Sequence, residues 1–313
     1  FNNTINPVNN GMVISSSVLN NISNNTLNTS ADGIVFIGGQ QNIVDFNSIN
    51  STSEGLFLSG SDYGKFRGNN VISDAVGAFL QIGAIGNNFS NNNFTVSSSG
   101  TYGVRFGGTD TNNTFVNDYI NSSGTSDIYS AGNAGDYNYF VNSSFNKNSI
   151  TAAAPGRIYV QWYLDLTVKN GSLTAINGSL ININNSLNEF EISNLYTNIS
   201  GQIPRQTLTE FFRNSTGQFN QTPHNITAIR ITPTPAYRLN YTVINLSQTN
   251  STAVTLIQKF NSDPVLTNPA MNLTVVYTDT NHINASVTYT DDDLDLGNIT
   301  FIWYVNNNEI KKL

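Results

Sequence analysis

The segments GIVFIGG (residues 33–39), GLFLSGS (55–61) and GAFLQIG (77–83) decide the fold, because they repeat one pattern at a fixed interval. The pattern also occurs as GMVISSS (11–17), GVRFGGT (103–109) and, with Asp in place of the leading Gly, DIYSAGN (127–133). The six starts are 22, 22, 22, 26 and 24 residues apart. A second element keeps the same step: NNTI (2–5), NNTL (24–27), FNSI (46–49), NNVI (69–72), NNNF (91–94), NDYI (117–120) and NSSF (142–145). Two elements that share one period indicate a repeat architecture.

Each repeat contains the short apolar and polar alternation of β-strands and lacks the apolar spacing of a helix. A unit this short cannot bury its own apolar face, whereas parallel stacking of successive units can. The sequence therefore predicts an all-β protein with a parallel β-helix over residues 1–155. It would have six or seven coils, spaced by about 4.8 Å.

Alternation along the strands predicts which side chains point into the coils. In the glycine-led strand these are the first and third residues after the glycine, and in the second element it is the final apolar residue. The predicted inward residues are Met12, Ile14, Ile34, Phe36, Leu56, Leu58, Ala78, Leu80, Val104 and Phe106, with Ile5, Leu27, Ile49, Ile72, Phe94, Ile120 and Phe145. The recurring asparagines are predicted to occupy turns and to stack as amide ladders. The leading glycine is predicted to need a positive φ.

These repeats resemble the right-handed parallel β-helix repeats of the pectate-lyase-like proteins, and within them the NosD-like surface and periplasmic proteins. The resemblance covers about half of the chain. It implies a fold rather than a function, because β-helices include enzymes, adhesins and inert scaffolds.

The pattern changes near Pro155. The run RIYVQWYLDLTVK (157–169) alternates, and shorter strand-like runs follow, so we predict a β-sandwich over residues 156–260. The segment TNISGQIP (197–204) resembles the turn and strand of carboxypeptidase regulatory-like, transthyretin-like sandwiches. That resemblance implies a spacer or presentation module without catalytic activity.

A third module is predicted over residues 261–313. Its segment TDDDLDLGNITFIWY (290–304) resembles the acidic turn and tryptophan-bearing strand of Ig-like and PKD-like surface modules. About 50 residues are too few for a complete sandwich of roughly 100. We therefore expect this sandwich to be incomplete and the sequence to be a piece of a longer polypeptide.

The composition excludes several classes of function. Charged residues make up 11% of the chain, 52 residues are asparagine, and the net charge is −7. Without a basic patch, nucleic acid is not an expected partner. Cysteine is absent, which excludes disulfides, thiol catalysis and cysteine-bound zinc. No stretch approaches the roughly 20 apolar residues of a membrane helix. An extracellular, surface-layer-like location fits these features.

Asn-X-Ser/Thr triplets, the acceptor pattern for N-glycosylation, occur 23 times. Either they carry glycans, or they follow from a composition rich in Asn, Ser and Thr. Representative candidates are Asn2, Asn50, Asn121, Asn198, Asn250 and Asn298.

Metal and catalytic candidates are few. Asp291, Asp293 and Asp295 either bind Ca²⁺, which prefers oxygen ligands, or form a solvated turn; no other cofactor is expected. His224 and His282 lie in different modules, so neither a triad nor a histidine metal site is expected, and both are predicted at the surface. We assign no catalytic residue.

The carboxylates of the rod offer one stacked pair. Asp32 and Glu54 each directly precede a leading glycine in neighbouring coils, and Val76 and Tyr102 at the next equivalent positions end the acid stack at two. An acid before a turn glycine also has a purely structural explanation.

The second residue after each leading glycine is predicted to face outward. From the second coil onward these residues are Val35, Phe57, Phe79 and Arg105. Either they form an exposed ladder that binds a glycan, a partner protein or a second copy of the chain, or a loop or neighbouring module covers them.

Two functions remain open at this point. The first is an extracellular structural or adhesive protein whose rod binds glycans or other surface proteins. The second is a secreted polysaccharide lyase or hydrolase on the same β-helix. An extended stack of acids on one face would favour the enzyme, and a smooth Asn/Ser/Thr face would favour the scaffold.

Overall fold

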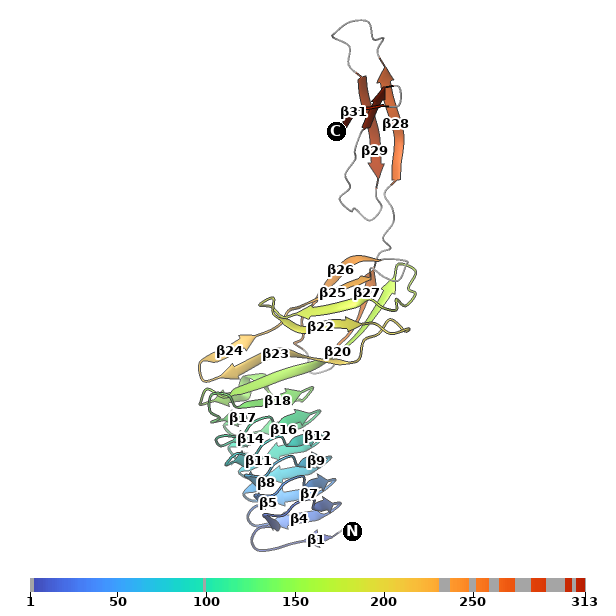
Figure 1. Ribbon diagram of the computed structural model, residues 1–313. Coiled ribbons are helices and arrows are strands. Elements are labelled where there is room, and N and C mark those ends of the chain that lie inside the picture. Colours follow the sequence, from blue (N-terminus) through green and yellow to red (C-terminus); the bar gives the residue numbers. More distant parts are fainter. Residues whose placement is uncertain are drawn as a thin grey trace.

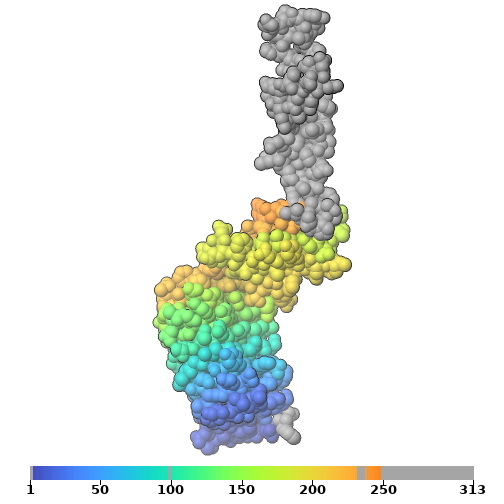
Figure 2. Space-filling view, in the orientation of Figure 1, coloured from blue at the N-terminus to red at the C-terminus, as the bar shows by residue number. Residues whose placement is uncertain are grey.

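The computed structural model describes residues 3–97, 100–230, 237–247, 252–258, 265–273, 283–290, 302–305 and 308–312. Its N-terminal part is a right-handed parallel β-helix, as predicted, in which three sheets run along a rod (Figure 1). The coils form one uninterrupted surface from the blue N-terminal end to the yellow region that follows the rod (Figure 2).

Three parallel sheets form the walls of the rod, and each coil contributes one short strand to each wall. Sheet A consists of β1 (Thr4–Ile5), β4 (Thr26–Thr29), β7 (Ser48–Ser51), β10 (Asn70–Ser73), β13 (Asn93–Val96) and β16 (Tyr119–Ser122). Sheet B consists of β2 (Met12–Ser15), β5 (Ile34–Ile37), β8 (Glu54–Ser59), β11 (Val76–Gln81), β14 (Tyr102–Phe106), β17 (Ser126–Ser130) and β19 (Ile150–Ala152). Sheet C begins with β3 (Asn21–Ser23), β6 (Ile43–Asp45), β9 (Lys65–Arg67), β12 (Asn88–Ser90), β15 (Thr114–Val116) and β18 (Tyr137–Val141). The 3-10 turn η1 (Lys147–Ser149) precedes β19.

The core of the rod follows the predicted alternation. On sheet B the residues from Ile34 to Phe106 that were predicted inward are all fully buried, and Met12 and Ile14 pack against the same cluster. Sheet C adds a ladder of phenylalanines, with ring centroids 4.5 Å apart for Phe66 and Phe89 and 4.3 Å apart for Phe89 and Phe115. Parallel stacking thus converts the one or two inward side chains of each strand into a continuous core.

One predicted inward residue is wrong. Ile72 is 44% exposed, and Val71 is fully buried in its place. The register explains the difference, because Val71 lies beside Ile49 and Phe94, the inward residues of the neighbouring coils. In this coil the strand begins at Asn70, one residue earlier than the alignment of the quartets implies.

The reason for the leading glycines also differs from the prediction. These glycines do not have a positive φ; the left-handed residues lie at the corners between strands, and Asn24, Phe46 and Gly68 are successive examples. A Cβ on Gly33 would lie 2.4 Å from the carbonyl oxygen of Gly55 and 2.4 Å from Cγ2 of Ile49. Glycine is needed there because the next coil approaches too closely for any side chain.

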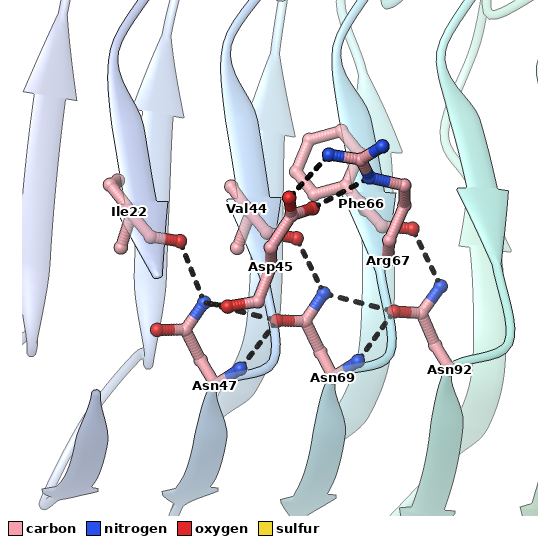
Figure 3. A network of polar contacts seen from close by, with 8 residues as sticks. All are labelled: Ile22, Val44, Asp45, Asn47, Phe66, Arg67, Asn69 and Asn92. Carbon is pink, nitrogen blue, oxygen red and sulfur yellow. Dashed lines mark hydrogen bonds and ion pairs between the residues drawn. The ribbon is translucent and has the colours of Figure 1, made fainter. Parts of the chain in front are cut away.

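The predicted asparagine ladders are present, and Figure 3 shows one of them. The Nδ2 of Asn47 donates to Oδ1 of Asn69 at 3.0 Å, and Asn69 donates to Asn92 at 2.9 Å. Each side chain also bonds the backbone of a neighbouring coil, as in the 2.8 Å bond from Asn69 Nδ2 to Val44 O. A second ladder joins Asn87, Asn113 and Asn138. These buried amides satisfy one another and fix the register of the coils.

Sheet C continues beyond the rod through the long strand β20 (Arg157–Asn170), which pairs in parallel with β18 and antiparallel with β23 (Gln206–Asn214). The remaining strands on it are β24 (Gly217–Asn220) and β27 (Thr252–Gln258). A separate antiparallel sheet, sheet D, consists of β21 (Leu180–Asn184), β22 (Phe190–Tyr196), β25 (His224–Arg230) and β26 (Tyr237–Ile244). Buried residues of both sheets belong to one hydrophobic cluster, as a sandwich requires.

The described strands nearest the C-terminus form two antiparallel hairpins, β28 (Val265–Leu273) with β29 (Ile283–Thr290), and β30 (Ile302–Val305) with β31 (Asn308–Lys312). The division into three domains, and the Ig-like or PKD-like character of residues 261–313, stay predictions.

Candidate binding surface

The outward row of sheet B is the surface that the sequence singled out. Register places Val35, Phe57, Phe79 and Arg105 side by side on successive strands, as predicted, and Tyr129 follows them. We call Phe57, Phe79, Tyr102, Arg105 and Tyr129 the sheet B strip.

The row is not the fully exposed ladder that was one of the two predicted alternatives. Val35 is 3% and Phe79 is 8% exposed, so these two side chains are covered, while Phe57 and Arg105 are partly exposed. Phe79 contacts Phe57 and Arg105 on the adjacent strands, and the segment at Gly107 after β14 also lies against its ring, where a Cβ would come within 2.9 Å of Cε2. The rings of Phe57 and Phe79 are 5.4 Å apart, edge to face.

Arg105 is held among three aromatic rings. Its guanidinium carbon lies 4.4 Å from the ring centre of Phe79, 5.7 Å from that of Tyr102 and 5.9 Å from that of Tyr129. The rings of Tyr102 and Tyr129 lie 4.6 Å apart. A cation fixed by aromatic faces, with no ion pair among the residues that the structure describes, presents an ordered positive charge at the surface.

The stacked acids Asp32 and Glu54 lie in neighbouring coils, with Glu54 N donating to Asp32 Oδ1 at 3.3 Å. Burial, with a further contribution from Asp32, raises the pKa of Glu54. Val76 pairs with both Glu54 and Tyr102 in the register, so this acid stack contains two members.

Other carboxylates of the rod are engaged by their own surroundings. Asp45 is ion-paired with Arg67 on the adjacent strand (Figure 3). Asp110 accepts hydrogen bonds from the backbone N–H groups of Ala84, Gly107 and Gly108. Asp127 accepts from the backbone of Ser122 and Asn146. These groups cap loops and fix strands, which is a structural use of a carboxylate.

His224 is the clearest correction among the candidate residues. It was predicted at the surface, yet it is fully buried, and its Nε2 lies 3.3 Å from Oε2 of Glu191. The alternation of β25 turns it toward the core between sheets C and D. Within the described ranges no three residues among His, Asp and Glu gather as a metal site.

Some of the remaining predicted sites lie within the described residues, and the others lie outside them. Asn50, Asn121 and Asn198 are exposed, as a glycosylation acceptor must be, and Asn198 also accepts bonds from the backbone of Ser200 and Gln202. Asn2, Asn250 and Asn298, the candidate calcium ligands Asp291, Asp293 and Asp295, and His282 lie outside the described residues. No helix of the described residues is long and apolar enough to cross a membrane.

Sequence reasoning missed the third wall of the rod. The aromatic residues Phe66, Phe89, Phe115 and Phe140 recur with nearly the repeat period and mark it. Sequence reasoning also did not predict a surface of outward-facing aromatic residues on β20, β23 and β24, which extend this sheet beyond the rod.

Comparison with known proteins supports the β-helix. A family model described as right handed beta helix region matches residues 1–120. No curated protein sequence matches the chain.

Three solved structures show weak similarity. The major pilin subunit BcpA of Bacillus cereus gives a TM-score of 0.22 at 14% identity, over 36% of this chain and 32% of its own. A streptococcal ancillary pilin gives 0.19 at 14% identity, over 42% and 48%. The tailspike protein of Acinetobacter baumannii phage AM24 gives 0.29 at 12% identity, over 99% and 55%. The chain therefore spans between about a third and about half of the lengths of these proteins.

Proposed function

We propose that this chain is the rod of an extracellular surface protein, with a structural role and an adhesive outer face. The observation that carries the proposal is the way the coils are joined. Amide ladders, a continuous core and backbone bonds link each coil to the next along the rod. Such a construction suits a stiff spacer, because every coil is braced by its neighbours.

The sheet B strip is the proposed contact surface for glycans or partner proteins. Partly exposed aromatic rings beside a fixed guanidinium offer both apolar contact and charge. The carboxylates near it form one pair, and the others described above serve the backbone or an arginine. This arrangement favours binding over polysaccharide cleavage, for which a cluster of acids is expected.

A glycan array tests the adhesive role. The full chain is compared with Arg105→Gln combined with Tyr129→Ser, and Lys65→Gln is the control for loss of a surface charge elsewhere on the rod. We expect the double variant to lose roughly tenfold in affinity for the glycans that the natural chain retains. Absence of any binding, or equal losses in the control, would overturn the adhesive role.

The same polysaccharides separate the scaffold from an enzyme. After incubation with the chain, the polymers are assayed for new reducing ends and for unsaturated sugar ends. Unchanged polymers are the result expected for a binding rod. Shortened polymers would replace this proposal with the lyase or hydrolase alternative.

A further inference from the structure

A second aromatic surface crosses the place where the rod joins the sandwich. Strands β18, β20, β23 and β24 lie side by side in sheet C (Figure 1). Register aligns Tyr139 with Tyr159, Tyr159 with Phe212, and Phe212 with Phe219. Each of four adjacent strands therefore contributes one ring to a single row. We call this row, together with Tyr137 and Arg157, the sheet C platform.

The rings of the row contact one another in sequence. Ring centres are 5.3 Å apart for Tyr139 and Tyr159, 5.5 Å for Tyr159 and Phe212, and 4.7 Å for Phe212 and Phe219. The first and last of these pairs are stacked, with interplanar angles of 23° and 11°. At the spacing of β-strands the row is roughly 15 Å long. Because neighbouring rings face one another, the row offers an extended ligand a line of ring edges, with a more open ring at the Phe219 end.

These rings are not needed for the core. On the same strands the alternate residues Phe140, Trp162 and Phe211 fill the interior and are almost fully buried. The platform side chains point the other way, and Phe219 is 42% exposed. Five aromatic residues gathered on an outer face, on strands whose inner face is already filled, mark an interaction surface.

Arg157 gives the platform its charge. Its guanidinium carbon lies 4.7 Å from the ring centre of Phe212 and 5.6 Å from that of Tyr137, and Nη1 donates to the Tyr159 hydroxyl at 3.1 Å. Arg67 and Arg205 each have an aspartate partner, whereas Arg157 makes no ion pair within the part of the chain that the structure describes. Asp136, whose backbone carbonyl accepts from Arg157 N at 2.8 Å, uses its side chain to accept from Asn133 N at 2.6 Å.

We propose that the sheet C platform binds an anionic polysaccharide, with one sugar ring on the open side of Phe219, further sugars along the ring edges of Phe212 and Tyr159, and a sugar carboxylate on Arg157. A uronate would supply the counterion that Arg157 lacks, in a charge-assisted bond. The open side of the Phe219 ring can pack against the C–H face of a sugar, and the tyrosine hydroxyls add hydrogen-bonding groups. The inference extends the proposed adhesive role to a named ligand class, at residues separate from the sheet B strip.

Affinity electrophoresis of the full chain tests the site with two named polymers, polygalacturonate and neutral dextran. We expect polygalacturonate to retard the natural chain and dextran to retard it far less. Arg157→Gln and Phe219→Ser should each weaken the retardation by roughly tenfold in dissociation constant. The matched controls are Arg205→Gln, for an arginine that already has a partner, and Tyr196→Ser, for an aromatic residue 63% exposed on sheet D.

Each outcome decides the proposal. Retention of binding in both platform variants, or equal losses in both controls, overturns it, as does absence of retardation by polygalacturonate at low salt. Equal retardation by dextran overturns the anionic specificity, and platform-dependent binding of a protein instead of either polymer overturns the ligand class. Thermal melts of every variant identify losses caused by unfolding. Binding of polygalacturonate that is lost in the Arg105→Gln and Tyr129→Ser double variant but kept in both platform variants would place the polymer on the sheet B strip, so the two surfaces can fail independently.

Discussion

The side-chain amide of Asn92 donates a 2.9 Å hydrogen bond to Oδ1 of Asp118, which makes a buried carboxyl group the next member of an asparagine ladder. In the preceding coils the ladder amide also donates to a backbone carbonyl of the neighbouring coil, as Asn92 does to Phe66 O at 2.9 Å. By the repeat, Oδ2 of Asp118 takes the place of that donor, and the equivalent carbonyl is that of Phe89, which pairs with Phe66 in the register. Among the described residues Oδ2 has no hydrogen-bond partner.

A protonated Asp118 can donate a hydrogen bond as the amide does, whereas a carboxylate would face another acceptor. Burial raises the pKa of Asp118 to about 7, against an unfolded value near 3.9. The folded chain therefore holds a proton that the unfolded chain releases as the pH rises above about 4. As the pH rises from about 4 to about 7, the free energy of unfolding should fall by a few kcal/mol. Below about pH 4 the stabilising contribution of protonated Asp118 is fully present.

Asp118→Asn should remove this pH dependence, because an amide supplies the donor at every pH. We expect the variant to melt about 5 °C above the natural chain at about pH 8, and close to it at about pH 4. Calorimetry at both pH values gives the comparison. The variant and the natural chain share the other titrating carboxylates, so their difference isolates Asp118. An equal gain at both pH values would show that the carboxyl is not the cause.

A second prediction concerns the close approach of coils at Gly33. In Gly33→Ala the new methyl group would meet the carbonyl oxygen of Gly55 at 2.4 Å, so the backbone of the next coil must shift. We expect a loss of about 3 kcal/mol in the free energy of unfolding. Gly171→Ala is the control, because a Cβ there meets nothing within 4 Å, and its effect should stay within about 0.5 kcal/mol. Similar denaturation midpoints for the two variants would contradict the steric reason for glycine.

The contrast between Gly33 and Ile72 shows what the sequence could and could not predict. The heptapeptides predicted sheet B and its inward residues because strands of four to six residues display alternation. The reason for glycine at 33 depends on a carbonyl of another coil, which no local pattern contains. Val71 and Ile72 are both apolar, so only the neighbouring coils decide which of them points inward.

Sheet C was harder to predict for a different physical reason. Its rod strands, such as β9 and β12, have three residues with one buried side chain each, which leaves no alternation to detect. The outward surfaces depend even more on side chains from other strands. Phe79 is packed against Arg105 and Phe57 on adjacent strands and against the segment at Gly107. The sheet C platform combines strands separated by tens of residues along the chain.

A third prediction separates support from binding in the sheet B strip. Phe57→Ser combined with Phe79→Ser removes the edge-to-face pair and the ring under Arg105. Because Phe79 is almost fully covered, we expect a loss of about 2 kcal/mol in the free energy of unfolding. Ile37→Ser, at a residue 46% exposed on β5, should change it by less than about 0.5 kcal/mol. An equal effect in urea denaturation would mean that Phe57 and Phe79 do not act as packed support for Arg105.

A fourth prediction concerns the ion pair between the rod and the sandwich. Lys147 Nζ, next to sheet B, lies 2.6 Å from Oε2 of Glu210 on β23, and it also donates to Ser247 O at 2.9 Å. The indole Nε1 of Trp162 donates to the same glutamate oxygen at 2.5 Å. Lys147→Met leaves the carboxylate of Glu210, which is nearly buried, without its cation. We expect the free energy of unfolding to fall by about 2 kcal/mol, since water still reaches part of the site. The sandwich should also separate from the rod at a lower temperature than in the natural chain.

Calorimetry of the Lys147→Met chain should therefore resolve two transitions, or one broadened transition, where the natural chain has a sharper one. Adding Glu210→Met should restore most of the lost stability, because an apolar pair can replace a buried ion pair at little cost. The coupling measured by this double-mutant cycle assigns the effect to the pair itself. A single variant that melts like the natural chain would show that β20, which belongs to both parts, joins them without help from the ion pair.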